Sequence, residues 1–108
     1  MKLPDITKII AELREFDAEI SSIRVEGESG GGMVKAIVSG KQELLKLEID
    51  QAIMESKDKE LLEDLVVAAV NNALKKSLQA VTDRMKDKAF KLDLLSDLKG
   101  DKDNEGNT

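Results

Sequence analysis

No glycine or proline occurs between Ser56 and Gly100. Both residue types disfavour the interior of a helix, so an uninterrupted stretch of this length predicts one long helix. We expect Ser56 to open this helix and Asp58 and Glu60 to lie in its first turn, where the helix dipole favours anions. The second half of the chain is therefore predicted to be mainly one helix.

Residues 65–70 are apolar on every side of this predicted helix. A segment of this kind is covered on more than one side. We expect a small sheet from the same chain to cover one side and a second copy of the chain to cover the other; the alternative is an unusually closed monomer. The only aromatic residues are Phe16 and Phe90, so the core of one 108-residue copy is thin and aliphatic. We therefore predict a homodimer with an interface that includes Leu65, Val66, Val67, Ala69 and Val70.

A shorter helix is predicted over residues 5–21. Pro4 and Asp5 form a helix-start signal, with the Asp5 carboxylate placed to accept from free backbone amides. Apolar residues then recur at spacings of three and four, which marks one side of a helix, and the opposite side is charged. These apolar residues are Ile6, Ile9, Ile10, Leu13, Phe16 and Ile20. We interpret this stripe as a core or dimer contact.

Between the two helices the pattern becomes strand-like. The predicted strands are residues 23–25, 33–38 and 45–49. Residues 29–32 and 39–42 suit hairpin connections, which predicts an antiparallel meander with one buried and one wetter face. Residues 51–57 are predicted to be a short connector. The fold class is α+β, in the order α-β-β-β-α, with a three-stranded antiparallel meander and a long C-terminal helix.

The stretch Gly-Glu-Ser-Gly-Gly-Gly at residues 27–32 superficially resembles a phosphate-binding loop. A Walker loop requires Gly-Lys-Ser/Thr at the start of a helix, whereas Gly32 is followed by Met33, Val34 and a predicted strand. The stretch does not match the dinucleotide-binding fingerprint either, because both the glycine spacing and the strand-to-helix context of that motif are missing. We interpret the glycines as a turn between two strands.

The residue types argue against catalysis. The sequence contains no cysteine and no histidine, which excludes thiolate chemistry and removes the commonest general base and metal ligand. Glu60, Glu63 and Asp64 suit the first turn of a helix, and oxygen side chains at residues 101–105 suit an acidic tail better than a calcium loop. We expect no enzyme activity, no cofactor and no small-molecule substrate.

Charge is distributed unevenly along the chain. The net charge is −5, which opposes phosphate binding overall, but residues 75–91 hold six cations against Asp83 and Asp87. Such cations neutralise phosphates without reading bases. Because the chain has no tyrosine or tryptophan on which the bases of a single strand could stack, the expected target is the backbone of duplex DNA. A solvated helix end is the alternative interpretation. The candidate DNA-binding residues are Lys75, Lys76, Arg84, Lys86 and Lys88, followed by Lys8 and Arg14 of the first helix.

Two segments resemble the YbaB/EbfC family of bacterial nucleoid-associated proteins. The first is Arg-Val-Glu-Gly-Glu-Ser-Gly-Gly-Gly-Met-Val-Lys-Ala at residues 24–36, continuing through Val38-Ser39-Gly40 to residues 47–50. The second is Leu-Leu-Glu-Asp-Leu-Val-Val-Ala-Ala-Val-Asn-Asn-Ala at residues 61–73. Both occur in the order and at the distance usual in that family, and the resemblance covers residues 20–77.

The resemblance implies an intertwined homodimer with long helices projecting from a central body like tweezers. It also implies binding, bending or compaction of duplex DNA in the nucleoid, with effects on gene expression. We expect one YbaB/EbfC-like DNA-binding dimer domain over residues 1–99 and a disordered acidic tail over residues 100–108. No apolar run suits a secretory signal or approaches the roughly 20 residues of a membrane span, so we expect a cytoplasmic protein without a membrane partner.

The first helix departs from the family pattern because it is short and acidic. Its carboxylates are Glu12, Glu15, Asp17 and Glu19, against Lys8 and Arg14. A dimeric protein-interaction scaffold with weak or no DNA binding is therefore the alternative function.

Overall fold

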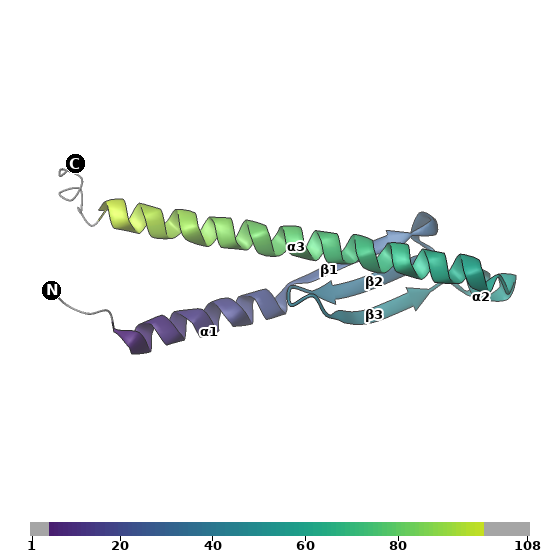
Figure 1. The fold of residues 1–108 in the computed structure, drawn as a ribbon, viewed down its shortest axis with the longest axis horizontal. Coiled ribbons are helices and arrows are strands. Elements are labelled where there is room, and N and C mark those ends of the chain that lie inside the picture. Colours follow the sequence, from purple (N-terminus) through teal and green to yellow (C-terminus); the bar gives the residue numbers. More distant parts are fainter. Residues whose placement is uncertain (1–4, 99–108) are drawn as a thin grey trace.

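The computed structural model describes the backbone of residues 5–98 and the side chains of residues 5–91. The predicted α-β-β-β-α order is confirmed, in an elongated molecule of 69 × 28 × 16 Å. Helices α1 and α3 diverge from the sheet end of the molecule like two arms (Figure 1). The tail predicted for residues 100–108 lies outside the described residues.

Helix α1 covers Ile6–Ser22. As predicted, Asp5 caps it: the Asp5 Oδ1 accepts a hydrogen bond of 3.0 Å from the Thr7 backbone amide. The helix ends where Ile23 turns to extended backbone. Ile20, in the last turn, is the one buried side chain of α1, and most of the apolar stripe before it is exposed.

The sheet is the predicted antiparallel meander, in the order β1-β2-β3. Its strands are β1 Arg24–Ser29, β2 Val34–Ser39 and β3 Leu44–Ile49. A 3-10 turn, Gly30–Gly32, joins β1 to β2, and all three glycines have positive φ, which explains why glycine is used there. Residues 39–42 close the second hairpin through a 3.0 Å bond from the Gln42 amide to the Ser39 carbonyl.

The segment after β3 differs from the sequence prediction in two ways. The expected connector is helix α2, Gln51–Ser56, and Asp50 caps it by accepting from the Ala52 amide at 2.8 Å. Helix α3, Lys59–Leu98, is opened by Asp58, which accepts from the Leu61 amide at 3.0 Å. Ser56 is not its cap, because Ser56 is the last residue of α2 and α3 starts only at Lys59. The Ser56 Oγ accepts from the Asp58 amide at 3.2 Å and donates to the Ile53 carbonyl at 2.6 Å.

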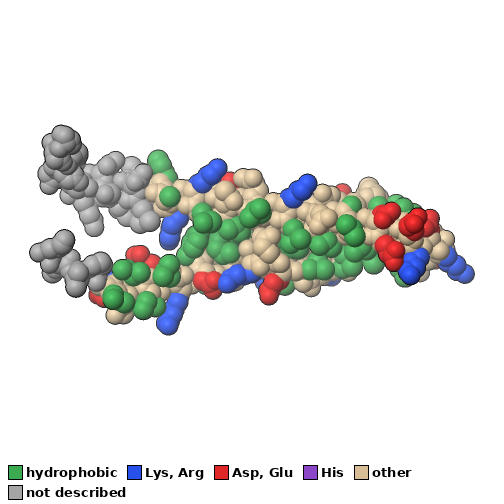
Figure 2. Space-filling view, viewed as in Figure 1, with side chains coloured by type: hydrophobic (Ala, Val, Ile, Leu, Met, Phe, Trp, Pro, Cys, Tyr) green, Lys and Arg blue, Asp and Glu red, His purple; other side chains and the backbone are tan. Residues whose placement is uncertain are grey.

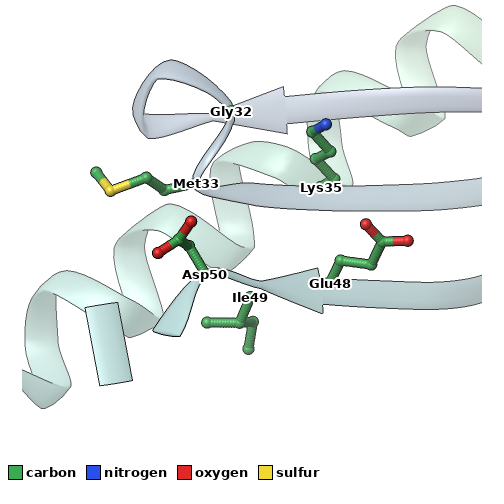
Figure 3. Close-up of a pocket in the computed structure, with 6 residues that line it drawn as sticks. All are labelled: Gly32, Met33, Lys35, Glu48, Ile49 and Asp50. Atoms are coloured by element: carbon green, nitrogen blue, oxygen red, sulfur yellow. The ribbon is translucent and has the colours of Figure 1, made fainter. Parts of the chain in front are cut away.

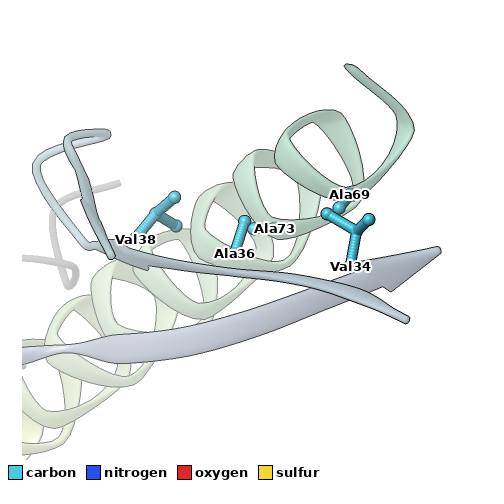
Figure 4. Packing of buried hydrophobic residues seen from close by; sticks show 5 residues of the cluster. All are labelled: Val34, Ala36, Val38, Ala69 and Ala73. Atoms are coloured by element: carbon cyan, nitrogen blue, oxygen red, sulfur yellow. The ribbon is translucent and has the colours of Figure 1, made fainter. Parts of the chain in front are cut away.

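The core is a thin layer between α3 and the first two strands. Helix α3 packs on β1 and β2. The fully buried apolar side chains are Val34, Ala36 and Val38 of β2 with Ala69 and Ala73 of α3 (Figure 4). The alanines let the helix approach the sheet closely.

Strand β3 lies outside this layer. Its register places Leu47 opposite Ala36 and Leu44 opposite Val38, both buried residues of β2. Nevertheless Leu44, Leu45 and Leu47 are exposed, because α3 lies over β1 and β2. The expectation of a buried face along the whole sheet is therefore wrong for β3 within one chain.

Candidate nucleic-acid interface

The cations of the basic run are divided among different faces of α3. Lys75 and Lys86 are eleven residues apart, which is three helical turns and about 16 Å along the axis, so they lie on one face. Both side chains are exposed. We call Lys75 and Lys86 the outer pair. In the space-filling view the blue side chains are spaced along α3 and do not form one cluster (Figure 2).

Arg84, Lys88 and Lys91 lie on a second face of α3 because they are spaced by four and three residues. Arg84 and Lys88 contact α1: the Arg84 Nη1 is 2.7 Å from the Glu19 Oε2, and the Lys88 Nζ is 5.6 Å from the centre of the Phe16 ring. The Lys91 Nζ is 3.5 Å from the Asp87 Oδ2. Each of these cations already has an intramolecular partner.

Lys76 holds helix α3 to the edge of the sheet. Its Nζ donates to the Glu26 carbonyl of β1 at 3.0 Å, and the Asn72 Nδ2, one turn earlier, donates to the Glu28 carbonyl at 2.9 Å. Both carbonyls lie on the edge of β1 that has no neighbouring strand. This structural use of Lys76 has no signal in the sequence, because it depends on where α3 crosses β1.

The cations of α1 do not form one surface. Lys8 and Arg14 are exposed, but six residues turn a helix by about 240°, which places them on opposite flanks of the apolar stripe. Elsewhere on α1, Asp17 pairs with Lys41 of the second hairpin. The hydrogen bond to Asp17 and its negative charge raise the pKa of Lys41.

The predicted dimer residues divide between the core and the surface. Ala69 is fully buried in the chain's own core, and Leu65, Val66 and Val70 are half-buried beside it. Val67 is 58% exposed, and Leu78, three turns further along α3, is 60% exposed. Asn72 and Lys76 reach over the β1 edge, and Val67 and Leu78 lie on the opposite flank of α3. This flank is therefore on the β3 side, where Leu44 and Leu47 are exposed opposite buried residues of β2. Together they form one uncovered apolar surface, which also shows as green between α3 and β3 in Figure 2.

A depression of about 200 Å³ lies at the end of the sheet, lined by Gly32, Met33, Lys35, Glu48, Ile49 and Asp50 (Figure 3). Its polar groups have structural uses: Asp50 caps α2, and Lys35 and Glu48 are opposite each other on neighbouring strands. Among the described residues no group of three or more acidic side chains is placed to hold a metal ion. None of the helices in the same part of the chain is long and apolar enough to cross a membrane.

The fold and charges define a small α+β protein with a long, cation-bearing helix laid across a three-stranded meander. The chain belongs to the YbaB/EbfC DNA-binding family, whose model matches residues 3–92.

The relatives that the chain matches are named as nucleoid-associated proteins, in agreement with the family. A nucleoid-associated protein of Chlorobium chlorochromatii (strain CaD3) is 50% identical over 74 residues, which are 68% of this chain and 65% of that protein. A nucleoid-associated protein of Chlorobaculum parvum is 44% identical over 86 residues, covering 73% of this chain and 76% of the relative. The chain thus spans just under two thirds of the Chlorobium chlorochromatii protein. Among solved structures, uncharacterized protein HP0035 from Helicobacter pylori has a TM-score of 0.56 at 29% identity, covering 81% of this chain and 96% of that one.

Proposed function

We propose that the protein binds duplex DNA as a homodimer, mainly through phosphate contacts, and so takes part in nucleoid organisation and gene expression. The observation that carries this proposal is the outer pair, since Lys75 and Lys86 are exposed on one face of a rigid helix in a DNA-binding family. Neither lysine is paired with an acidic residue in the described structure. Lysines so placed can neutralise phosphates without reading base sequence.

The homodimer is supported by the uncovered apolar surface of α3 and β3. Exposed large apolar residues gathered in one place, such as Val67, Leu78 and Leu47, mark an association surface. A dimer carries two outer pairs, one from each copy. The other candidate cations rank behind the outer pair. Three of them already have intramolecular partners, namely Lys76, Arg84 and Lys88. The remaining two, Lys8 and Arg14, lie on different flanks of α1. We place the protein in the nucleoid of the cytoplasm, as its relatives' names indicate.

The test is a titration of random duplex DNA against salt. About six phosphate contacts per dimer give a log–log slope near −5. In the variant Lys75→Gln/Lys86→Gln the dimer loses four cations, so we expect the slope to become less negative by about 3 to 4 and affinity at 100 mM salt to fall at least tenfold. The control Lys57→Gln/Lys59→Gln removes the same charge where α2 ends and α3 begins, away from the outer pair, and leaves binding within about twofold.

The second candidate is a dimeric protein-interaction scaffold. It is favoured by the acidic α1 and by the partners that Arg84 and Lys88 already have. Absence of a DNA complex at 50 mM salt with micromolar dimer, or an affinity that ignores salt, would reject DNA binding and leave the scaffold.

A further inference from the structure

A direct ion pair joins the two arms of the molecule. The Arg84 Nη1 of α3 lies 2.7 Å from the Glu19 Oε2 of α1, and the two side chains are 45% and 44% exposed. A guanidinium binds a carboxylate or a phosphate through the same planar set of donors. Glu19 therefore occupies Arg84 with a group that resembles a DNA phosphate in charge and hydrogen bonding.

The contact is one that a phosphate could replace. Exposed ion pairs contribute little to stability, so exchanging Glu19 for another anion costs the fold little. Helix α1 is also held lightly, because Ile20 is its one buried side chain while Ile6 and Leu13 are 67% and 63% exposed.

Lys88, one turn beyond Arg84, is drawn into the same contact between the arms. Its Nζ lies 5.6 Å from the centre of the Phe16 ring, and Phe16 precedes Glu19 on α1 by three residues. These two contacts thus hold two cations of α3 against α1. DNA that approached Arg84 would have to compete with α1.

We propose that Glu19 is a built-in competitor for phosphate at Arg84, so that α1 lowers the affinity of α3 for duplex DNA. This inference rests on the proposed DNA binding. The pair of Glu19 and Arg84 keeps the affinity for duplex DNA below the value that the charges of α3 alone would give. It also makes that affinity sensitive to anything that moves α1 away from α3.

The experiment is a double-mutant cycle on the full chain, read as duplex affinity between 50 and 200 mM salt. Glu19→Gln keeps the shape of the side chain and removes its charge. Glu15→Gln is the matched control: Glu15 lies one turn earlier on α1, is exposed, and pairs with no cation in the described structure. We expect Glu19→Gln to tighten binding about three- to tenfold and to make the salt slope more negative by about 1 to 2 per dimer. Glu15→Gln changes affinity less than twofold.

The second half of the double-mutant cycle tests whether the gain in duplex affinity requires Arg84. In an Arg84→Gln background the Glu19→Gln gain disappears if the inference holds. An equal gain from Glu15→Gln, or a gain that persists without Arg84, would overturn the competition while leaving DNA binding intact. Failure of the parent and every variant to bind at 50 mM salt would instead reject the proposed function, and with it the inference. Circular dichroism of each variant confirms that α1 and α3 are still formed.

Discussion

Gly27 of β1 lies directly against the backbone of Ala73 in α3. A Cβ atom at Gly27 would stand 2.2 Å from the Ala73 nitrogen and 2.6 Å from the Ala69 carbonyl oxygen. The neighbouring backbone atoms cannot move aside as the end of a side chain could. Gly27 therefore sets the distance between α3 and the sheet, although the sequence suggests only that it belongs to a glycine-rich turn.

Gly27→Ala is expected to destabilise the fold by about 3 kcal/mol or more, because the methyl group forces helix and strand apart. Urea unfolding measures the change. Gly31→Ala is the control: Gly31 has a φ of +67° with nothing within 4 Å of an added Cβ, so it carries only a backbone cost of about 1–2 kcal/mol. Equal losses for the two variants would contradict the close-contact explanation.

Ser77 supplies the buried polar link between α3 and the second hairpin. Its Oγ donates to the Ser39 carbonyl at 2.7 Å and accepts from the Gln42 Nε2 at 2.8 Å, and the residue is fully buried. Ser77→Ala removes both bonds and is expected to cost about 1–3 kcal/mol in thermal or urea unfolding. Ser22→Ala, which loses an exposed bond to the Glu19 carbonyl, should change stability by less than about 0.5 kcal/mol.

Lys57 offers a stabilising substitution. It ends α2 in the left-handed conformation with a φ of 59°, which glycine adopts without steric cost. Lys57→Gly is expected to gain about 0.5–1 kcal/mol in the free energy of unfolding. Gln42 has a similar φ of 65°, but Gln42→Gly also loses the hydrogen bond to Ser77. The Gln42 variant should therefore gain less or lose stability, and an equal gain at both positions would show that the hydrogen bond contributes nothing.

Leu78 tests the proposed dimer surface. It is 60% exposed on the flank of α3 that faces the β3 side. Leu78→Glu places a charge in that surface and is expected to shift the protein from dimer to monomer in sedimentation at about 10 μM, because an unpaired charge is costly to bury. Gln79→Glu adds the same charge one residue later, about 100° around the helix, and should stay dimeric. A dimer that survives Leu78→Glu would move the interface elsewhere.

The pair of Asp17 and Lys41 has a defined pH dependence. Asp17 raises the pKa of Lys41 above its ordinary value of 10.5. A raised pKa means that the folded state holds the proton more tightly, so the pair's contribution is complete below the ordinary pKa of 10.5 and is lost as pH rises through the folded-state pKa. The free energy of unfolding should therefore fall less between pH 9 and pH 11.5 in Asp17→Asn than in the parent protein. An equal fall in thermal melts would show that the pair does not form in solution.

Much of the fold follows from local features of the sequence. The cap at Asp5, the alternation along β2 and the glycines of the 30–32 turn act over a few residues, so periodicity and turn chemistry predict them correctly. The connector prediction failed at α2 because a helix of six residues is too short to show a 3.6-residue period. Ser56 and Asp58 are both good caps, and the choice between them depends on where α2 ends: Ser56 is its last residue, so Asp58 directly precedes α3 and caps it.

The sequence by itself determined the order of elements, the long helix and the local excess of cations after Lys75. Only the tertiary structure decided how those cations are used. The outer pair faces away from the sheet, since Lys75 lies about 200° around the helix from the buried Ala73. Lys76 is bound to the β1 edge, and Arg84 is paired with a carboxylate 65 residues earlier in the chain. The physical reason is that charge and periodicity are local, whereas the partner of a side chain depends on which helix face the packing of Ala69 and Ala73 turns toward the sheet.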